Sequence, residues 1–135
     1  MRASYSRIYI HLIWATWDRL DLIDDKLEPI LYSYITKKCR QQNGLLLQIG
    51  GTCNHIHLLV KLLPATNIAQ FVKNIKGSSS HYIAQIVRVD SFFKWQGGYA
   101  TISVSPTHLS RISAYIAAQE EHHQMNSCNK DWEFS

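Results

Sequence analysis

The sequence predicts an α+β domain of the ferredoxin-like, split βαβ type, with helices on one face of an antiparallel sheet and a further C-terminal helix. Three observations support this fold class. The first apolar segment alternates with a period of two, which is typical of a strand. Later segments carry apolar residues three and four positions apart, which indicates helices. Glycine and proline divide the segments, and the resulting order is β-α-β-β-α-β plus one helix.

The first third of the chain contains the opening strand and the first helix. Apolar side chains recur at every second position from Ile8 to Trp14, so a long strand is expected between Tyr5 and Trp17. Helical spacing runs from Leu27 to the Asn43-Gly44 pair, which is a typical helix stop. Asp25 with Glu28 three residues later resembles a capping box at the start of this helix.

Two strands and a second helix follow. Leu45–Ile49 is a short apolar strand, and the turn at Gly50-Gly51 leads into the next strand, Asn54–Leu62. Helical spacing resumes from Ile68 to Ile75. This helix is expected to break or loosen at residues 77–80, because glycine and three consecutive serines are weak helix formers.

The last two elements are a strand and the C-terminal helix. Tyr99–Val104 reads as a fourth strand after a pair of glycines. Ser105-Pro106 is a helix start, with serine as the cap and proline as the first residue. The buried stripe of this helix is predicted to include Leu109, Ile112 and Ile116.

Length and composition are those of one globular domain spanning residues 1–135. No apolar stretch approaches the roughly 20 residues of a membrane span, and the N-terminus lacks the pattern of a signal peptide, so a cytoplasmic protein with no membrane partner is expected. The net charge is +4 and the pI about 9.0. Between Lys37 and Lys94 there are eight basic residues and one acid, Asp90, which suits a polyanionic partner.

Two histidines in the third predicted strand are the strongest functional signal. His55 and His57 are two positions apart, so their imidazoles project from the same face of the strand. A paired imidazole of this kind can bind a divalent cation. The alternative is structural, because strand histidines also form hydrogen bonds with loops or lie exposed at an edge.

Tyr115 and Gln119 are four positions apart in the last predicted helix and therefore share a helix face. The pair would present a phenol and a carboxamide in the same direction. A tyrosine in an amphipathic helix is more often a packing residue, and its ordinary pKa of roughly 10 makes it a poor nucleophile unless it is activated. Gln119, however, is a poor core residue, which favours a functional reading of this face.

A basic and aromatic segment follows the histidine strand. Lysines alternate with hydroxyl groups and aromatics there, and these are the groups that contact phosphates and stack on unpaired bases. Solvated helix ends and core packing explain the same residues equally well. The candidate DNA contacts are Lys73, Lys76, Ser79, Lys94 and Trp95.

Taken together, these motifs resemble a known family over nearly the whole chain. The matching segments are Trp14–Arg19, His55-Ile-His57, Lys73–Ser79, Lys94–Tyr99, Ser103–Pro106 and Tyr115–His123, the last of which begins Tyr115-Ile-Ala-Ala-Gln119. They are similar to the small HUH-type, single-tyrosine transposases of the insertion sequence 200/605 group. A histidine pair followed about sixty residues later by Tyr-x-x-x-Gln is specific in a chain this short.

The resemblance implies a function and a site. His55, His57 and Gln119 would bind Mg²⁺ or Mn²⁺, and Tyr115 would attack a DNA phosphate to form a 5′-phosphotyrosine intermediate. The substrate would be single-stranded DNA with hairpins at the element's ends. Such a transposase would cleave the DNA and rejoin it elsewhere without ATP, because the tyrosyl ester conserves the energy of the broken bond.

The family's members are homodimers in which the tyrosine helix completes the partner's metal site, and the same is expected here. A long first strand with an uncovered edge would favour pairing with a second copy. Two other readings compete with an active transposase. One is a domesticated or inactive relative that binds hairpin DNA or RNA as a regulator, and the other is an unrelated metal-dependent hydrolase.

Overall fold

The computed structural model describes residues 4–119 and 132–133. Four strands form one antiparallel sheet in the order β2-β3-β1-β4. The strands are β1 (Ile8–Ala15), β2 (Leu45–Gly51), β3 (His55–Leu62) and β4 (Ala100–Val104). This is the strand order of the split βαβ plan, so the predicted fold class is confirmed.

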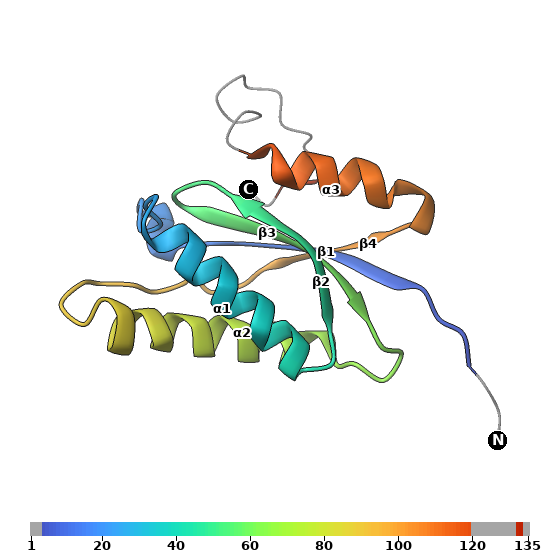
Figure 1. The fold of residues 1–135 in the computed structure, drawn as a ribbon, viewed down its shortest axis with the longest axis horizontal. Helices are drawn as coiled ribbons and strands as arrows, with labels where there is room; N and C mark the ends of the chain where they lie inside the picture. The colour runs from blue at the N-terminus through green and yellow to red at the C-terminus, as the bar shows by residue number, and fades with distance from the viewer. Residues whose placement is uncertain (1–3, 120–131, 134–135) are drawn as a thin grey trace.

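Different helices cover the two faces of the sheet (Figure 1). Helices α1 (Leu27–Gln41) and α2 (Ile68–Tyr82) lie on one side, and α3 (Leu109–Ala117) lies on the other. Strand β3 is therefore buried on both faces, and any polar side chain it points toward α3 needs a partner. Within the described ranges, no helix has the length and apolar composition needed to cross a membrane.

Each face of the sheet has its own apolar cluster. The larger core, under α1 and α2, includes the even-numbered side chains Ile10, Leu12 and Trp14 of β1. The smaller cluster, under α3, is formed by Leu59, Val104, Ile112 and Ile116. The smaller cluster holds the tyrosine helix against the sheet, because the two buried aliphatic side chains of α3 both belong to it.

Strand β1 is an inner strand, and this corrects one expectation. It pairs with β3 along its whole length and with β4 from Tyr9 to Ile13. It offers no uncovered edge to a second copy, and the edges of the sheet are β2 and β4. The alternation of β1 revealed which of its faces is apolar, but an alternating pattern says nothing about which strands pair beside it.

The first helix is capped by the residue just before the predicted capping box. The Asp24 carboxylate accepts hydrogen bonds from the backbone N–H groups of Lys26 at 3.1 Å and Leu27 at 2.8 Å. Asp24 therefore caps the helix, a role that was predicted for Asp25. The Arg88 guanidinium, 2.7 Å from the same carboxylate, is the main reason why the pKa of Asp24 lies well below its usual range.

The sequence predicts a break at residues 77–80, but the second helix continues through them. It runs on to Tyr82 and continues as a π-helical turn, Ile83–Val87. The serine hydroxyls turn back onto the helix, where Ser79 donates to the carbonyl of Lys76 at 3.2 Å. Ser79 is also fully buried, so tertiary packing overrides the weak helix propensity of this segment.

The tyrosine helix is positioned by its start and by a glycine. The Ser105 hydroxyl accepts a hydrogen bond from the backbone N–H of Thr107, as predicted for a cap, and a short 3₁₀ turn, Pro106–His108, leads into α3. Near the end of α3, a Cβ placed on Gly50 of β2 would lie 2.1 Å from the carbonyl oxygen of Ile116. Backbone therefore contacts backbone there, and only glycine leaves room for the helix at this distance.

Candidate active site

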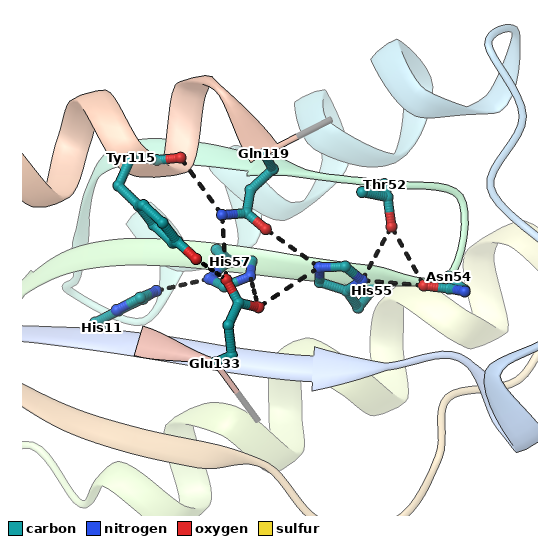
Figure 2. Close-up of polar contacts among 8 residues, drawn as sticks. All are labelled: His11, Thr52, Asn54, His55, His57, Tyr115, Gln119 and Glu133. Carbon is teal, nitrogen blue, oxygen red and sulfur yellow. Dashed lines mark hydrogen bonds and ion pairs between the residues drawn. The ribbon is translucent and has the colours of Figure 1, made fainter. Parts of the chain in front are cut away.

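The two histidines of β3 point toward α3 from the same face of the strand (Figure 2). Both are buried, and their ring centroids lie 5.2 Å apart. The Nε2 atoms of both rings face the interior of the site, where they meet Gln119, two residues past the end of α3, and Glu133 of the C-terminal segment. The two-residue spacing placed both imidazoles correctly on one face.

Tyr115 and Gln119 reach the same place from the other side. The Tyr115 ring lies edge-on to that of His57, with 6.2 Å between centroids. The Gln119 side-chain oxygen is 3.2 Å from Nε2 of His55, and its amide group donates to the carbonyl oxygen of Tyr115 at 3.4 Å. All four side chains singled out in the sequence therefore come together, and they do so within one chain.

Glu133 is a member of the site that sequence reasoning missed. One carboxylate oxygen lies 3.1 Å from Nε2 of His57 and 3.9 Å from Nε2 of His55. The other accepts a hydrogen bond from the Tyr115 hydroxyl. An acid 14 positions beyond Gln119 carries no periodic relation to the motif, so the sequence held no signal for it.

The chemistry of these groups fits a divalent cation. His55, His57 and Glu133 offer three ligand atoms that all lie within 4.8 Å of one another. The oxygen of Gln119 is close enough to His55 to provide a fourth. A mixture of imidazole nitrogens with carboxylate and carboxamide oxygens suits Mn²⁺ or Mg²⁺, and two histidines with one carboxylate also leave open positions for a substrate oxygen.

Each imidazole is also held at its outer nitrogen. Nδ1 of His55 lies 2.9 Å from the Thr52 hydroxyl and 3.0 Å from the side-chain oxygen of Asn54. Nδ1 of His57 lies 2.8 Å from Nε2 of His11. Burial, reinforced by the nearby His57, lowers the pKa of His11 to about 3, so this ring is neutral at physiological pH.

The predicted DNA-contacting lysines line a shallow groove between α2 and residues 94–99. The groove has a volume of about 400 Å³. Lys73 and Lys94 are exposed there, and the Lys94 ammonium lies 4.1 Å from the centroid of the Trp17 ring. Lys76 is half-buried and donates to the carbonyls of Gln96 at 2.7 Å and Gly98 at 2.6 Å. Burial lowers the pKa of Lys76, and its ammonium holds the loop in place.

Ser79 and Trp95 correct the predicted set. Both are buried, and the Trp95 indole N–H donates to the Ser79 hydroxyl at 2.9 Å. Trp95 lines the groove wall but is only 5% exposed, and Ser79 is fully buried, so neither side chain is open to a base or a phosphate. The exposed aromatics nearby are Trp17 and Phe92, which are 40% and 56% exposed. Spacing alone could not separate core from surface aromatics in this segment.

Sequence comparison with known proteins identifies the family of this chain. Residues 4–119 match the family model described as "Transposase IS200 like". The chain belongs to this family of transposases, which are DNA-cleaving enzymes. It is 27% identical over 126 residues to the ISDra2 transposase TnpA of Deinococcus radiodurans, which covers 89% of each chain. It is 26% identical to the transposase of insertion sequence element IS200 from Salmonella typhimurium, over 85% of this chain and 78% of the relative.

Solved structures agree with the fold. A crystal structure of a protein assigned as a transposase in Deinococcus radiodurans R1 has a TM-score of 0.71 and 25% identity, covering 86% of this chain and 93% of that one. A REP-associated tyrosine transposase bound to a REP hairpin has a TM-score of 0.66, over 99% of this chain and 79% of that one. Its identity is 14%, so this second likeness supports the fold alone.

Proposed function

We propose that this transposase cleaves and rejoins single-stranded DNA with Tyr115 as the nucleophile, at a site that binds Mg²⁺ or Mn²⁺. One observation carries the proposal: the Tyr115 hydroxyl, the two imidazole Nε2 atoms and the Glu133 carboxylate converge on one buried point. A tyrosine that only packed the core would not need two histidines and a carboxylate beside its hydroxyl.

The side chains divide the chemistry between them. His55, His57 and Glu133 would hold the cation, with Gln119 as a further ligand. The bound cation would polarise the scissile phosphate and stabilise the charge that develops on it. The oxygen of Tyr115 forms a bond to phosphorus while the bond to the 3′ oxygen breaks, leaving a 5′-phosphotyrosine and a 3′ oxygen that takes up a proton from water to become the 3′-hydroxyl. Glu133, which already accepts the hydrogen bond of the phenol, is placed to receive its proton.

The experiment uses single-stranded DNA that carries a hairpin and a candidate cleavage site. The chain, the DNA and Mn²⁺ are incubated and separated on a denaturing gel. We expect a protein band shifted by the mass of the attached DNA, and no such band when a chelator removes the metal. Binding without any adduct in Mg²⁺ or Mn²⁺ would instead favour the regulator that binds hairpins, and cleavage without an adduct would favour a metal-dependent hydrolase.

The DNA is expected to be a hairpin with an adjoining single strand. One structural neighbour is bound to a REP hairpin. In this chain Lys73 and Lys94 line the groove, and the partly exposed ring of Trp17 lies beside the groove against the Lys94 ammonium. Exposed lysines contact phosphates, and an exposed aromatic ring stacks on an unpaired base.

Affinity for such a hairpin should therefore exceed that for a plain duplex of the same length, and it should fall steeply with added salt as counterions are released. Fluorescence anisotropy across a salt series measures both effects. Equal affinity for hairpin and duplex would refute the proposed substrate.

The functional unit is proposed to be a homodimer in which α3 of each subunit completes the metal site of the other. Within one chain, α3 packs on β2 and β3 (Figure 1). If the two subunits exchange α3, the helix of each would make these contacts with β2 and β3 of the other subunit. Helix α3 follows β4 after Ser105 and one short turn, and this connection would have to redirect it.

Mixing Tyr115→Phe protein with His57→Ala protein tests the exchange. Each variant alone lacks one essential group. If sites are shared, the mixed dimer contains one site with intact histidines and an intact tyrosine, and cleavage returns. Two different affinity tags allow the mixed dimer to be isolated and its mass confirmed. A confirmed mixed dimer that stays inactive would show that each site is built within one chain.

A further inference from the structure

His11 lies directly behind the metal ligand His57. In the β1–β3 register, His57 is opposite Ile13, and His11 is two positions earlier on the same face of β1, so the two histidines are diagonal neighbours. Their ring centroids are 5.0 Å apart, and Nε2 of His11 is 2.8 Å from Nδ1 of His57 (Figure 2). One proton must lie between these two nitrogens.

A histidine at position 11 stabilises the core less than an aliphatic residue would. Its side chain is fully buried, and Nδ1 has no hydrogen-bond partner among the described residues. A buried polar atom that loses its hydrogen bonds to water and gains no partner destabilises the fold. An aliphatic side chain, like that of Ile13 on the same face, would avoid this cost, so the position calls for an explanation beyond packing.

The direction of that proton decides whether His57 can bind a cation. A neutral imidazole carries its hydrogen on one nitrogen and a lone pair on the other. Nε2 of His57 faces the site, so it can act as a ligand only when the hydrogen is on Nδ1. Nδ1 then needs a buried acceptor, and Nε2 of His11 is the atom in place.

We propose that His11 is a positioning residue that accepts the Nδ1 hydrogen of His57 and so keeps its Nε2 lone pair directed at the metal. The inference rests on the proposed metal site. The other ligand is arranged in the same way, because Nδ1 of His55 faces the side-chain oxygen of Asn54. Outer partners of this kind fix the ring orientation and tautomer of a ligating histidine.

Binding of Mn²⁺, measured by calorimetry, tests the role of His11 without any cleavage reaction. His11→Leu fills the space but accepts no hydrogen bond, and it should weaken Mn²⁺ binding by about 10–100-fold. His11→Gln keeps an acceptor oxygen near the position of Nε2 and should restore most of the affinity. His81→Leu, which removes an exposed histidine of α2, is the matched control and should bind as the unmodified chain does.

A spectroscopic measurement on the unmodified chain keeps the test valid if His11→Leu does not fold. With Zn²⁺ as a diamagnetic probe, long-range ¹H–¹⁵N spectra should show His57 protonated at Nδ1 and ligated through Nε2. Ligation through Nδ1 would overturn the role of His11.

If folded His11→Leu binds Mn²⁺ as tightly as the unmodified chain does, the proposed role of His11 is wrong. The proposed metal site is not affected by that result. If the unmodified chain itself binds no Mn²⁺, the metal site fails and the role of His11 fails with it.

Discussion

Tyr115→Phe should eliminate the covalent protein–DNA adduct and reduce cleavage by about a thousandfold or more, because it removes the oxygen that attacks phosphorus. The phenyl ring can keep its edge-on contacts with His57 and Trp132, whose centroids lie 6.2 and 4.9 Å away. The fold and the binding of hairpin DNA should therefore change little. The denaturing gel reports the adduct, and anisotropy reports binding.

Tyr34→Phe is the matched control for this prediction. Tyr34 belongs to α1, on the opposite side of the sheet, and its ring stacks on that of Tyr82 with 4.4 Å between centroids. Removing its hydroxyl should leave adduct formation unchanged. An adduct that persists in Tyr115→Phe would show that another group is the nucleophile.

Gly50→Ala should have the second largest effect, although residue 50 takes no part in the chemistry. Its new Cβ would lie 2.1 Å from the backbone carbonyl oxygen of Ile116, where contacts below 3.0 Å are essentially never found. No side-chain rotation relieves a clash with backbone, so the end of α3 must move by roughly 1 Å. A displacement of this size at Tyr115, next to Ile116 in the chain, is expected to slow cleavage by about 100-fold.

The same clash should lower the free energy of unfolding by about 1–3 kcal/mol, as other overpacked substitutions do. Cleavage is therefore measured well below the melting temperature of the variant, with circular dichroism to show that it is folded. Gly77→Ala is the control for stability. A Cβ at residue 77 meets no atom within 4 Å, so alanine should raise the stability of α2 by about 0.5–1 kcal/mol. Unchanged cleavage in Gly50→Ala would mean that the position of α3 is not set at this contact.

Spacing along single elements was enough to predict much of this protein. Alternation in β1 and the His-x-His of β3 identified two strands, because successive side chains of a strand point to opposite faces whatever surrounds it. Tyr115 and Gln119 were grouped for the equivalent reason on a helix. These local rules require no knowledge of neighbouring elements, and the order of elements then indicated the split βαβ sheet.

Contacts between distant segments decided the rest. Glu133 and His11 join the site from the C-terminal segment and from β1, and neither has a fixed spacing from the histidines of β3. The sequence left Trp95 open between a DNA contact and core packing. The structure buries it against Ser79, because burial depends on what packs over a residue and not on its flanking sequence. The sequence by itself determined which faces of the strands and helices carry the reactive groups. Only the tertiary structure decided which of these groups meet, since pairing, register and packing are properties of the assembled sheet.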